Sequence, residues 1–181
     1  TLATGEAFEV PGSAILAPAA PFWSPDSRQL AYLTQPGNFL TAVFDVATRT
    51  SRELCTCRFQ RGSWGPTGVI LLGTLDGSPI QRVSLTDRLP SAVTRAEATD
   101  GELDSLPIWL PDGQRFLFTR SRPGSAPVTY AASLDGGEPR RVADGSWDLI
   151  AQSGIDGGAY LLGLEAAGLV ARSFDVSTLS V

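Results

Sequence analysis

A Trp-x-Pro motif recurs along this chain at nearly constant spacing. It occurs at Trp23–Pro25, Trp64–Pro66 and Trp109–Pro111, so the tryptophans lie 41 and 45 residues apart. A further step of 44 residues from Asp112 reaches Asp156, in a degraded fourth copy without Trp or Pro. Self-similarity with a period of about 20–50 residues indicates a repeat architecture, in which each unit buries its apolar face against its neighbours. This repeat restricts the fold more than any other feature.

Short apolar segments of strand length follow each copy of the motif. The predicted first strands after the motif are Gln29–Leu33, Val69–Leu72, Arg115–Phe118 and Ala159–Leu162. The predicted second strands are Phe39–Val46, Ile80–Leu85, Val128–Leu134 and Leu169–Val176, and the third strands end near Leu54, Val93 and Val142. Short strands separated by regular turns, without sustained helical periodicity, predict an all-β protein.

A period of this length with about four strands is typical of a β-propeller blade. The 181 residues therefore predict one β-propeller segment over residues 1–181, with about four blades that are each a four-stranded antiparallel sheet. The repeats start near residues 23, 64, 109 and 153. Thr4–Val10 has the pattern of a third strand, so residues 1–20 are predicted to end a preceding blade.

The motif has a physical explanation in the turn that it forms. Proline restricts φ, Asp-Gly or Asp-Ser favours a tight turn, and the aspartate accepts hydrogen bonds from backbone amides. The tryptophan ring is predicted to be buried between blades. Aspartates that recur once per blade are interpreted as turn-forming residues rather than catalytic acids. The residues of this structural motif are Trp23, Pro25, Asp26, Trp64, Pro66, Trp109, Pro111, Asp112 and Asp156.

A count of four blades does not decide whether the ring is closed. The chain closes as a four-bladed ring, pairs with a second copy, or remains a partial propeller with exposed blade faces and edges. Among these alternatives we expect a half-propeller that associates with itself.

The composition excludes most catalytic machinery. The chain contains no His, Lys or Met, and all 14 of its cationic side chains are Arg. A Ser-His-Asp triad, a Schiff-base or P-loop lysine and a histidine zinc site are therefore excluded. We predict no catalytic residue, no cofactor and no metal.

Charge and hydropathy restrict the partners. The net charge is −5, which argues against nucleic acid and anionic membrane surfaces as ligands. No apolar run reaches the roughly 18 residues of a membrane span, so no membrane contact by this segment is expected. The expected partner is a protein or a peptide.

Three local features are candidate sites with a structural alternative. The acidic stretch Glu97–Asp104 carries four carboxylates but lacks EF-hand spacing, which favours a solvated inter-blade loop over a Ca²⁺ site. Trp147 and Asp148 lie outside the repeat phase, where a ligand contact is an alternative to the favoured packing between blades. Cys55 and Cys57 point to one face of a strand, and two thiols are favoured over a strained disulfide.

The motif residues also carry a family resemblance. Pro21–Tyr32 resembles the WD40-like PD40 repeat of TolB-type β-propellers, in which W-S-P-D-G precedes an apolar strand. Three other segments resemble the C-terminal propellers of bacterial eukaryotic-like serine/threonine kinases; they are Arg61–Leu72, Asp135–Val142 and Gly168–Ser177.

The resemblance implies a non-catalytic binding or sensor module in the extracytoplasmic, periplasmic part of a membrane-anchored receptor kinase. Such a module would recognise a protein, a peptide or a small ligand. The chain itself contains no kinase motif, so the catalytic half would lie elsewhere. The alternatives are the non-catalytic propeller of a prolyl oligopeptidase-like hydrolase and a TolB-like periplasmic protein-interaction domain.

Overall fold

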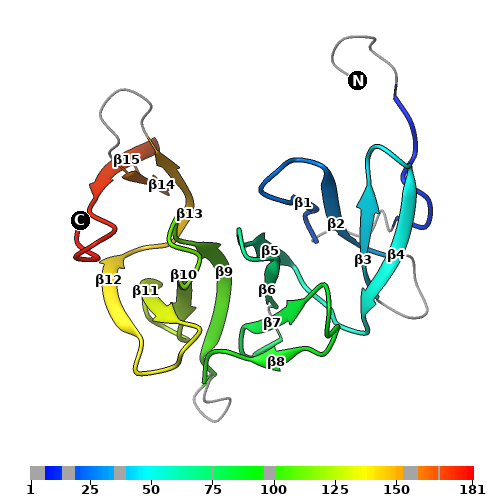
Figure 1. Ribbon diagram of the computed structural model, residues 1–181. Helices are drawn as coiled ribbons and strands as arrows, with labels where there is room; N and C mark the ends of the chain where they lie inside the picture. Colours follow the sequence, from blue (N-terminus) through cyan, green and yellow to red (C-terminus); the bar gives the residue numbers. More distant parts are fainter. Residues whose placement is uncertain are drawn as a thin grey trace.

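The computed structural model describes residues 7–13, 19–34, 40–74, 76–95, 101–152, 159–166 and 168–181. These residues form fifteen strands and no helix, in three four-stranded antiparallel sheets and one three-stranded sheet (Figure 1). The predicted all-β class is confirmed, and each sheet is one propeller blade. No helix that could span a membrane occurs in these ranges.

The strands follow one another within each blade as an antiparallel meander. Blade 1 contains β1 (Phe22–Trp23), β2 (Gln29–Leu33), β3 (Thr41–Asp45) and β4 (Thr50–Cys55). Blade 2 contains β5 (Arg61–Trp64), β6 (Val69–Gly73), β7 (Gln81–Ser84) and β8 (Ser91–Ala92). Blade 3 contains β9 (Leu103–Trp109), β10 (Arg115–Ser121), β11 (Val128–Ser133) and β12 (Arg140–Asp144). Blade 4 contains β13 (Trp147–Gln152), β14 (Ala159–Glu165) and β15 (Gly168–Phe174).

Blade 4 has three strands where four were predicted. After β15, Asp175 and Ser180 form an isolated antiparallel bridge. Blade 1 has an equivalent pair, also five residues apart, in which Asp45 pairs with Thr50 at the start of β4. The predicted blade start near residue 153 lies outside the described residues, and β13 begins at Trp147.

The four blades form an open arc (Figure 1). The inner strands β1, β5, β9 and β13 line its concave side, and blades 1 and 4 lie at its two ends. The chain is therefore a partial β-propeller of four blades, and the alternative of a closed four-bladed ring is not observed.

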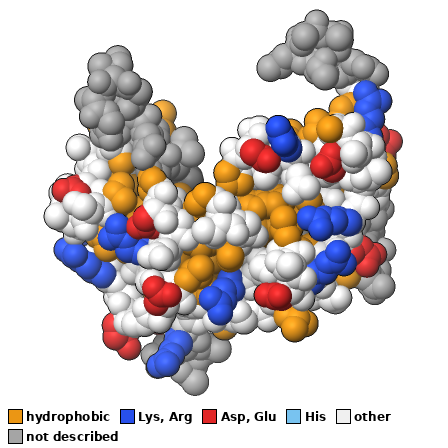
Figure 2. All heavy atoms as spheres, in the orientation of Figure 1, with side chains coloured by type: hydrophobic (Ala, Val, Ile, Leu, Met, Phe, Trp, Pro, Cys, Tyr) orange, Lys and Arg blue, Asp and Glu red, His pale blue; other side chains and the backbone are white. Residues whose placement is uncertain are grey.

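Apolar side chains fill the spaces between consecutive blades. We call the side of a blade that faces the preceding blade its near face, and the opposite side its far face. Ala31 and Val43 on the far face of blade 1 pack with Trp64 and Ile70 on the near face of blade 2. Equivalent clusters join blade 2 to blade 3 and blade 3 to blade 4. Figure 2 shows hydrophobic side chains gathered between blades, with charged side chains around them.

The repeat tryptophans differ in burial. Trp64 and Trp109 are 8% exposed and belong to the inter-blade clusters, as predicted. Trp23 is 54% exposed, which contradicts its predicted place in the core. The cause is its position on the near face of blade 1, because the described chain provides no preceding blade to cover it.

The aspartates of the motif form turns, as expected. Asp26 Oδ1 accepts hydrogen bonds from Ser24 Oγ (2.6 Å) and from the Arg28 amide (3.1 Å). The Ser24 hydroxyl group is the main cause that lowers the pKa of Asp26. Asp112 Oδ1 likewise accepts from the amides of Gln114 and Arg115, both at 2.9 Å. Asp156 lies outside the described residues.

The N-terminal segment differs from the prediction. Residues 1–6 lie outside the described residues, and residues 7–10 form no strand. Instead, the ring of Phe8 packs on Phe44 with centroids 5.8 Å apart, and Val10 packs on the cluster of Tyr32, Ala42 and Phe44. This segment therefore covers part of the near face of blade 1, because that face is apolar and has no other neighbour in the described chain.

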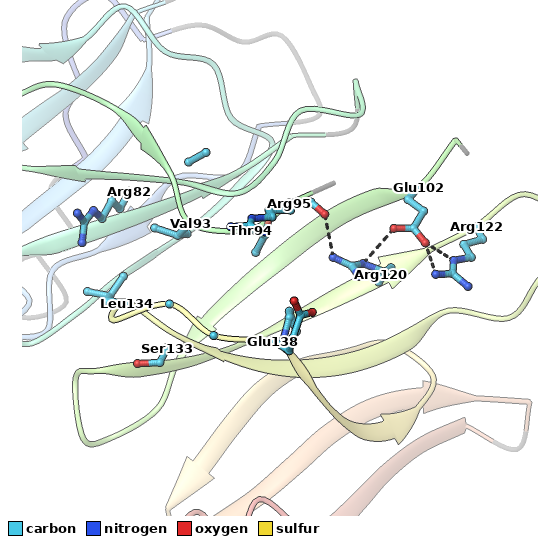
Figure 3. Close-up of a pocket in the computed structure, with 14 residues that line it drawn as sticks. Arg82, Val93, Thr94, Arg95, Glu102, Arg120, Arg122, Ser133, Leu134 and Glu138 are labelled. Carbon is cyan, nitrogen blue, oxygen red and sulfur yellow. Dashed lines mark hydrogen bonds and ion pairs between the residues drawn. The ribbon is translucent and has the colours of Figure 1, made fainter. Parts of the chain in front are cut away.

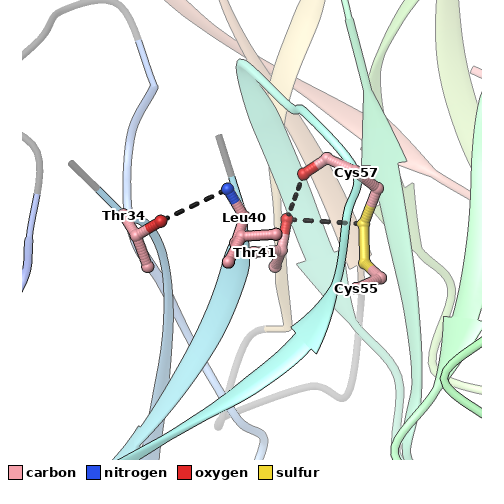
Figure 4. The surroundings of a disulfide bond; sticks show 5 residues. All are labelled: Thr34, Leu40, Thr41, Cys55 and Cys57. Atoms are coloured by element: carbon pink, nitrogen blue, oxygen red, sulfur yellow. Dashed lines mark hydrogen bonds between the residues drawn. A yellow bond between two sulfur atoms is a disulfide. The ribbon is translucent and has the colours of Figure 1, made fainter. Parts of the chain in front are cut away.

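The two cysteines form a disulfide, which corrects the prediction of two thiols (Figure 4). Their Cα atoms lie 5.2 Å apart, within the range of about 4.4–6.8 Å that disulfides span. Thr41 Oγ1 donates a 2.7 Å hydrogen bond to the Cys57 carbonyl oxygen. Cys57 has left the strand by this point, and the contact with Thr41 holds it beside Cys55 at the end of β4.

Candidate functional site

The described part of the predicted acidic loop is buried rather than solvated. Residues 96–100 lie outside the described residues, but Glu102 and Asp104 are buried at the start of β9. This corrects the prediction of a solvated loop. Both side chains face arginines of β10 and the turn after it, because Asp104 pairs in register with Arg120 across the β9–β10 hairpin. Their oxygens are therefore engaged by guanidinium groups.

Arg120 is the centre of this ion-pair network. Its Nε lies 2.7 Å from Asp104 Oδ1, its Nη2 lies 2.9 Å from Asp104 Oδ2, and Nε is 3.6 Å from Glu102 Oε2. The guanidinium carbon also lies 5.4 Å from the ring centroids of both Phe118 and Tyr130. The hydrogen bonds that Arg120 donates to the Asp104 carboxylate raise the pKa of Arg120. A bidentate pair of this kind fixes the orientation of the side chain.

Arg122 extends the network toward solvent. Its guanidinium group is hydrogen-bonded to Glu102, while the side chain remains 58% exposed. Glu102 thus lies between the guanidinium groups of Arg120 and Arg122 (Figure 3). The Glu102 carboxylate is buried, whereas its partner Arg122 places a positive charge at the surface.

The network forms one wall of a groove of about 810 Å³ between blades 2 and 3. The blade 2 side is formed by Arg82 and residues 92–95, which follow from β8. The blade 3 side is formed by Glu102, Arg120, Arg122 and the β11–β12 turn at residues 133–139. Two of the turn residues, Gly136 and Gly137, have φ of 91° and 96°, a backbone conformation that glycine adopts without strain.

The lining of the groove offers charged and hydrogen-bonding groups to a ligand. Four arginines and two glutamates line it, and an arginine stays protonated in proteins. No cysteine lies among the lining residues. The described residues contain no group of three or more His, Cys, Asp or Glu arranged to hold a metal ion. The groups in the groove can therefore attract, orient and hydrogen-bond a ligand.

Trp147, the sequence candidate for a ligand contact, lies in the interior. It is 3% exposed, and its Nε1 donates a 3.1 Å hydrogen bond to the Asp144 carbonyl oxygen. The ring lies against Gly163, where an added Cβ would approach it to 2.8 Å, and the Arg172 guanidinium lies 5.1 Å from its centroid. This placement agrees with packing between blades 3 and 4. Asp148 follows within β13.

The far face of blade 4 is a second exposed feature. Ala159, Leu161 and Phe174 pack toward blade 3, so the alternate residues of β14 and β15 point away from it. Leu164 and Leu169 pair in register on that far face and are 75% and 73% exposed. Together with Trp23 at the other end of the arc, they leave both end blades with apolar side chains exposed.

Comparisons with solved structures show a TolB-like propeller fold. The structure of TolB from Acinetobacter baumannii is similar with a TM-score of 0.60 and 14% identity, over 87% of this chain and 43% of that chain. A putative TolB from Agrobacterium tumefaciens gives a TM-score of 0.64 and 16% identity, over 85% of this chain and 60% of that one. A prolyl endopeptidase gives 0.57 and 15%, over 88% of this chain and 27% of that one.

This chain therefore spans less than two thirds of the length of each of these three proteins. No protein-family model and no curated protein sequence matches it. At this level of identity the likeness defines a class of fold, a propeller of the kind found in TolB and in prolyl endopeptidases.

Proposed function

We propose that this chain is a non-catalytic binding module that recognises a protein or peptide segment. The observation that carries the proposal is the groove between blades 2 and 3, which is open, polar and lined by permanently charged arginines. Small-molecule sites are mostly apolar and enclosed, whereas a polar groove beside the short edge strand β8 suits an extended segment of another chain.

The parent of the module is proposed from the sequence resemblance. Asp135–Val142 and Gly168–Ser177 support the extracytoplasmic, periplasmic part of a bacterial receptor-type serine/threonine kinase, which senses its ligand through the propeller. The fold shared with a prolyl endopeptidase favours a second candidate, the non-catalytic propeller of a prolyl oligopeptidase-like hydrolase. A TolB-like periplasmic interaction domain is the third. Kinase motifs elsewhere in the parent would support the receptor kinase. A G-x-S-x-G motif there would support the hydrolase.

Selection from a displayed library of random peptides tests the binding function. The immobilised wild-type chain is expected to enrich a defined set of peptides. Ala92→Trp places a large ring in the groove from the exposed strand β8 and is expected to abolish that enrichment. Glu53→Trp, on the exposed outer strand β4 of blade 1, is the matched control and should retain it. Failure to enrich any peptide, or the same set on Ala92→Trp, would contradict the proposal.

We also propose that a second copy of the chain covers the exposed end faces. In three places along the chain the far face of one blade already packs on the near face of the next. The far face of blade 4 in one copy would meet the part of the near face of blade 1 that residues 7–10 leave uncovered in another copy, where Trp23 is exposed. Two such contacts would close a ring with two-fold symmetry.

Light scattering tests this association. The wild-type chain is expected to form a dimer of the 19.1 kDa protomer, and Leu164→Arg together with Leu169→Arg is expected to leave a monomer. Leu89→Arg is the control, because Leu89 is equally exposed, at 77%, but lies in the connection between β7 and β8. A wild-type monomer at every concentration measured would contradict the proposal.

A further inference from the structure

We infer that the groove between blades 2 and 3 binds the carboxylate side chains of an acidic peptide. This inference rests on the proposed binding function and adds the chemical class of the ligand. The charge of the lining points to it. Four arginines line the groove against two glutamates, and the buried Asp104 pairs with Arg120, so this region keeps one excess positive charge although the whole chain has a net charge of −5. The groove thus concentrates positive charge on an otherwise acidic protein, which attracts an anionic segment.

Two of the lining arginines are available to a ligand. Arg82 donates from Nε to Ser91 Oγ at 3.1 Å, and this leaves its terminal nitrogens for other acceptors. Arg95 is exposed, and its carbonyl oxygen, rather than its guanidinium, takes part in the network with Arg120. Within the described chain neither side chain forms an ion pair with a carboxylate. A guanidinium group without a carboxylate partner can bind a ligand carboxylate through two parallel hydrogen bonds.

The buried network prepares the blade 3 side of the groove. Asp104 holds Arg120 in place, and the side chain of Arg120 is only 15% exposed. Glu102 orients Arg122 while leaving most of that side chain exposed. A ligand carboxylate would therefore meet an arginine whose position is already fixed, so less conformational entropy is lost on binding.

The spacing of the arginines favours a chain with several carboxylates over one small anion. Arg82 and Arg122 lie at opposite ends of the groove, with Arg95 between them (Figure 3). A single phosphate ion fills only a small part of a groove of about 810 Å³. An extended peptide presents successive side chains at intervals along the groove, since alternate residues of a strand point to the same side.

Fluorescence anisotropy with designed peptides tests the inference. The probe is a labelled decapeptide of alternating Glu and Gly, compared with the same peptide carrying Gln for Glu. We expect the Glu peptide to bind the full chain at least about tenfold more tightly, with an affinity that falls as salt is raised. Arg82→Gln together with Arg95→Gln should weaken the Glu peptide by about tenfold. Arg52→Gln, an exposed arginine on β4, should not change it.

Each other outcome has a defined meaning. Equal affinity for the Glu and Gln peptides overturns the acidic ligand but leaves the binding function intact. If neither peptide binds but library selection still enriches sequences that depend on the groove, the acidic ligand is likewise overturned and the binding function stands. If the library also enriches nothing, both proposals fail. Competition by inorganic phosphate as effective as that of unlabelled Glu peptide would assign the groove to small anions and overturn the peptide inference. Thermal unfolding of each variant confirms that the fold is retained.

Discussion

Replacing Trp109 with alanine is expected to lower the free energy of unfolding by about 3–5 kcal/mol, the range for truncation of a buried aromatic side chain. The indole ring packs edge-on to Phe116, with centroids 6.1 Å apart, and lies against Gly65 of the preceding blade. Its Nε1 donates a 3.1 Å hydrogen bond to the Ser63 carbonyl oxygen. The variant therefore loses the packing of this ring between blades 2 and 3 and one hydrogen bond between these blades. Urea unfolding followed by tryptophan fluorescence and circular dichroism measures the change.

Trp23→Ala is the matched control, because Trp23 occupies the same position of the repeat. With half of its side chain exposed, its truncation should cost less than about 1 kcal/mol in the monomeric chain. Both truncations are measured in the monomeric Leu164→Arg, Leu169→Arg background. Comparable losses there would show that Trp23 is buried within the single chain, contrary to the open arc.

Asp104→Asn is expected to lower the free energy of unfolding by about 3–5 kcal/mol, the range for the loss of one partner of a buried ion pair. Asp104 is fully buried and forms both hydrogen bonds of a bidentate pair with Arg120. The amide that replaces it cannot accept both donors, and Glu102 already pairs with Arg122. The guanidinium of Arg120 is then left buried with partial compensation. Urea unfolding at neutral pH measures this effect.

Asp144→Asn removes an ion pair that is exposed to solvent rather than buried. Asp144 and its partner Arg141 are 78% and 58% exposed, so the change should be no more than about 1 kcal/mol. High salt should reduce the effect of Asp144→Asn and leave that of Asp104→Asn nearly unchanged, because salt screens exposed charges most. A loss below about 1 kcal/mol for Asp104→Asn would show that the network does not support the groove.

The blades were predictable because their signals are local. Asp26 and Asp112 accept hydrogen bonds from amides two or three residues away, so the turn chemistry is contained in the motif itself. Each strand then follows from alternation over a few residues. The strands that end at the motif tryptophans were not among the predicted strands, and in blade 1 this strand has only two residues, Phe22 and Trp23.

The groove and its ion pairs depend on residues distant in sequence. Arg120 meets Asp104 across a hairpin, sixteen residues away, and the pairing of β9 with β10 was a usable signal for this contact. The opposite wall comes from residues 92–95 of another blade, for which no local pattern exists. The disulfide also depended on tertiary position, because Thr41 of β3 holds Cys57 beside Cys55.

The sequence alone determined the turns, because their hydrogen bonds join residues two or three positions apart. It determined the class of fold and the number of blades through the motif that recurs every 41–45 residues. The tertiary structure decided which members of the repeat are buried. Trp23 and Trp109 share a motif, yet only Trp109 has a preceding blade to cover its ring. It also decided that Glu102 and Asp104 lie inside rather than in solvent, since only the docking of β9 on β10 provides the arginines that make their burial affordable in free energy.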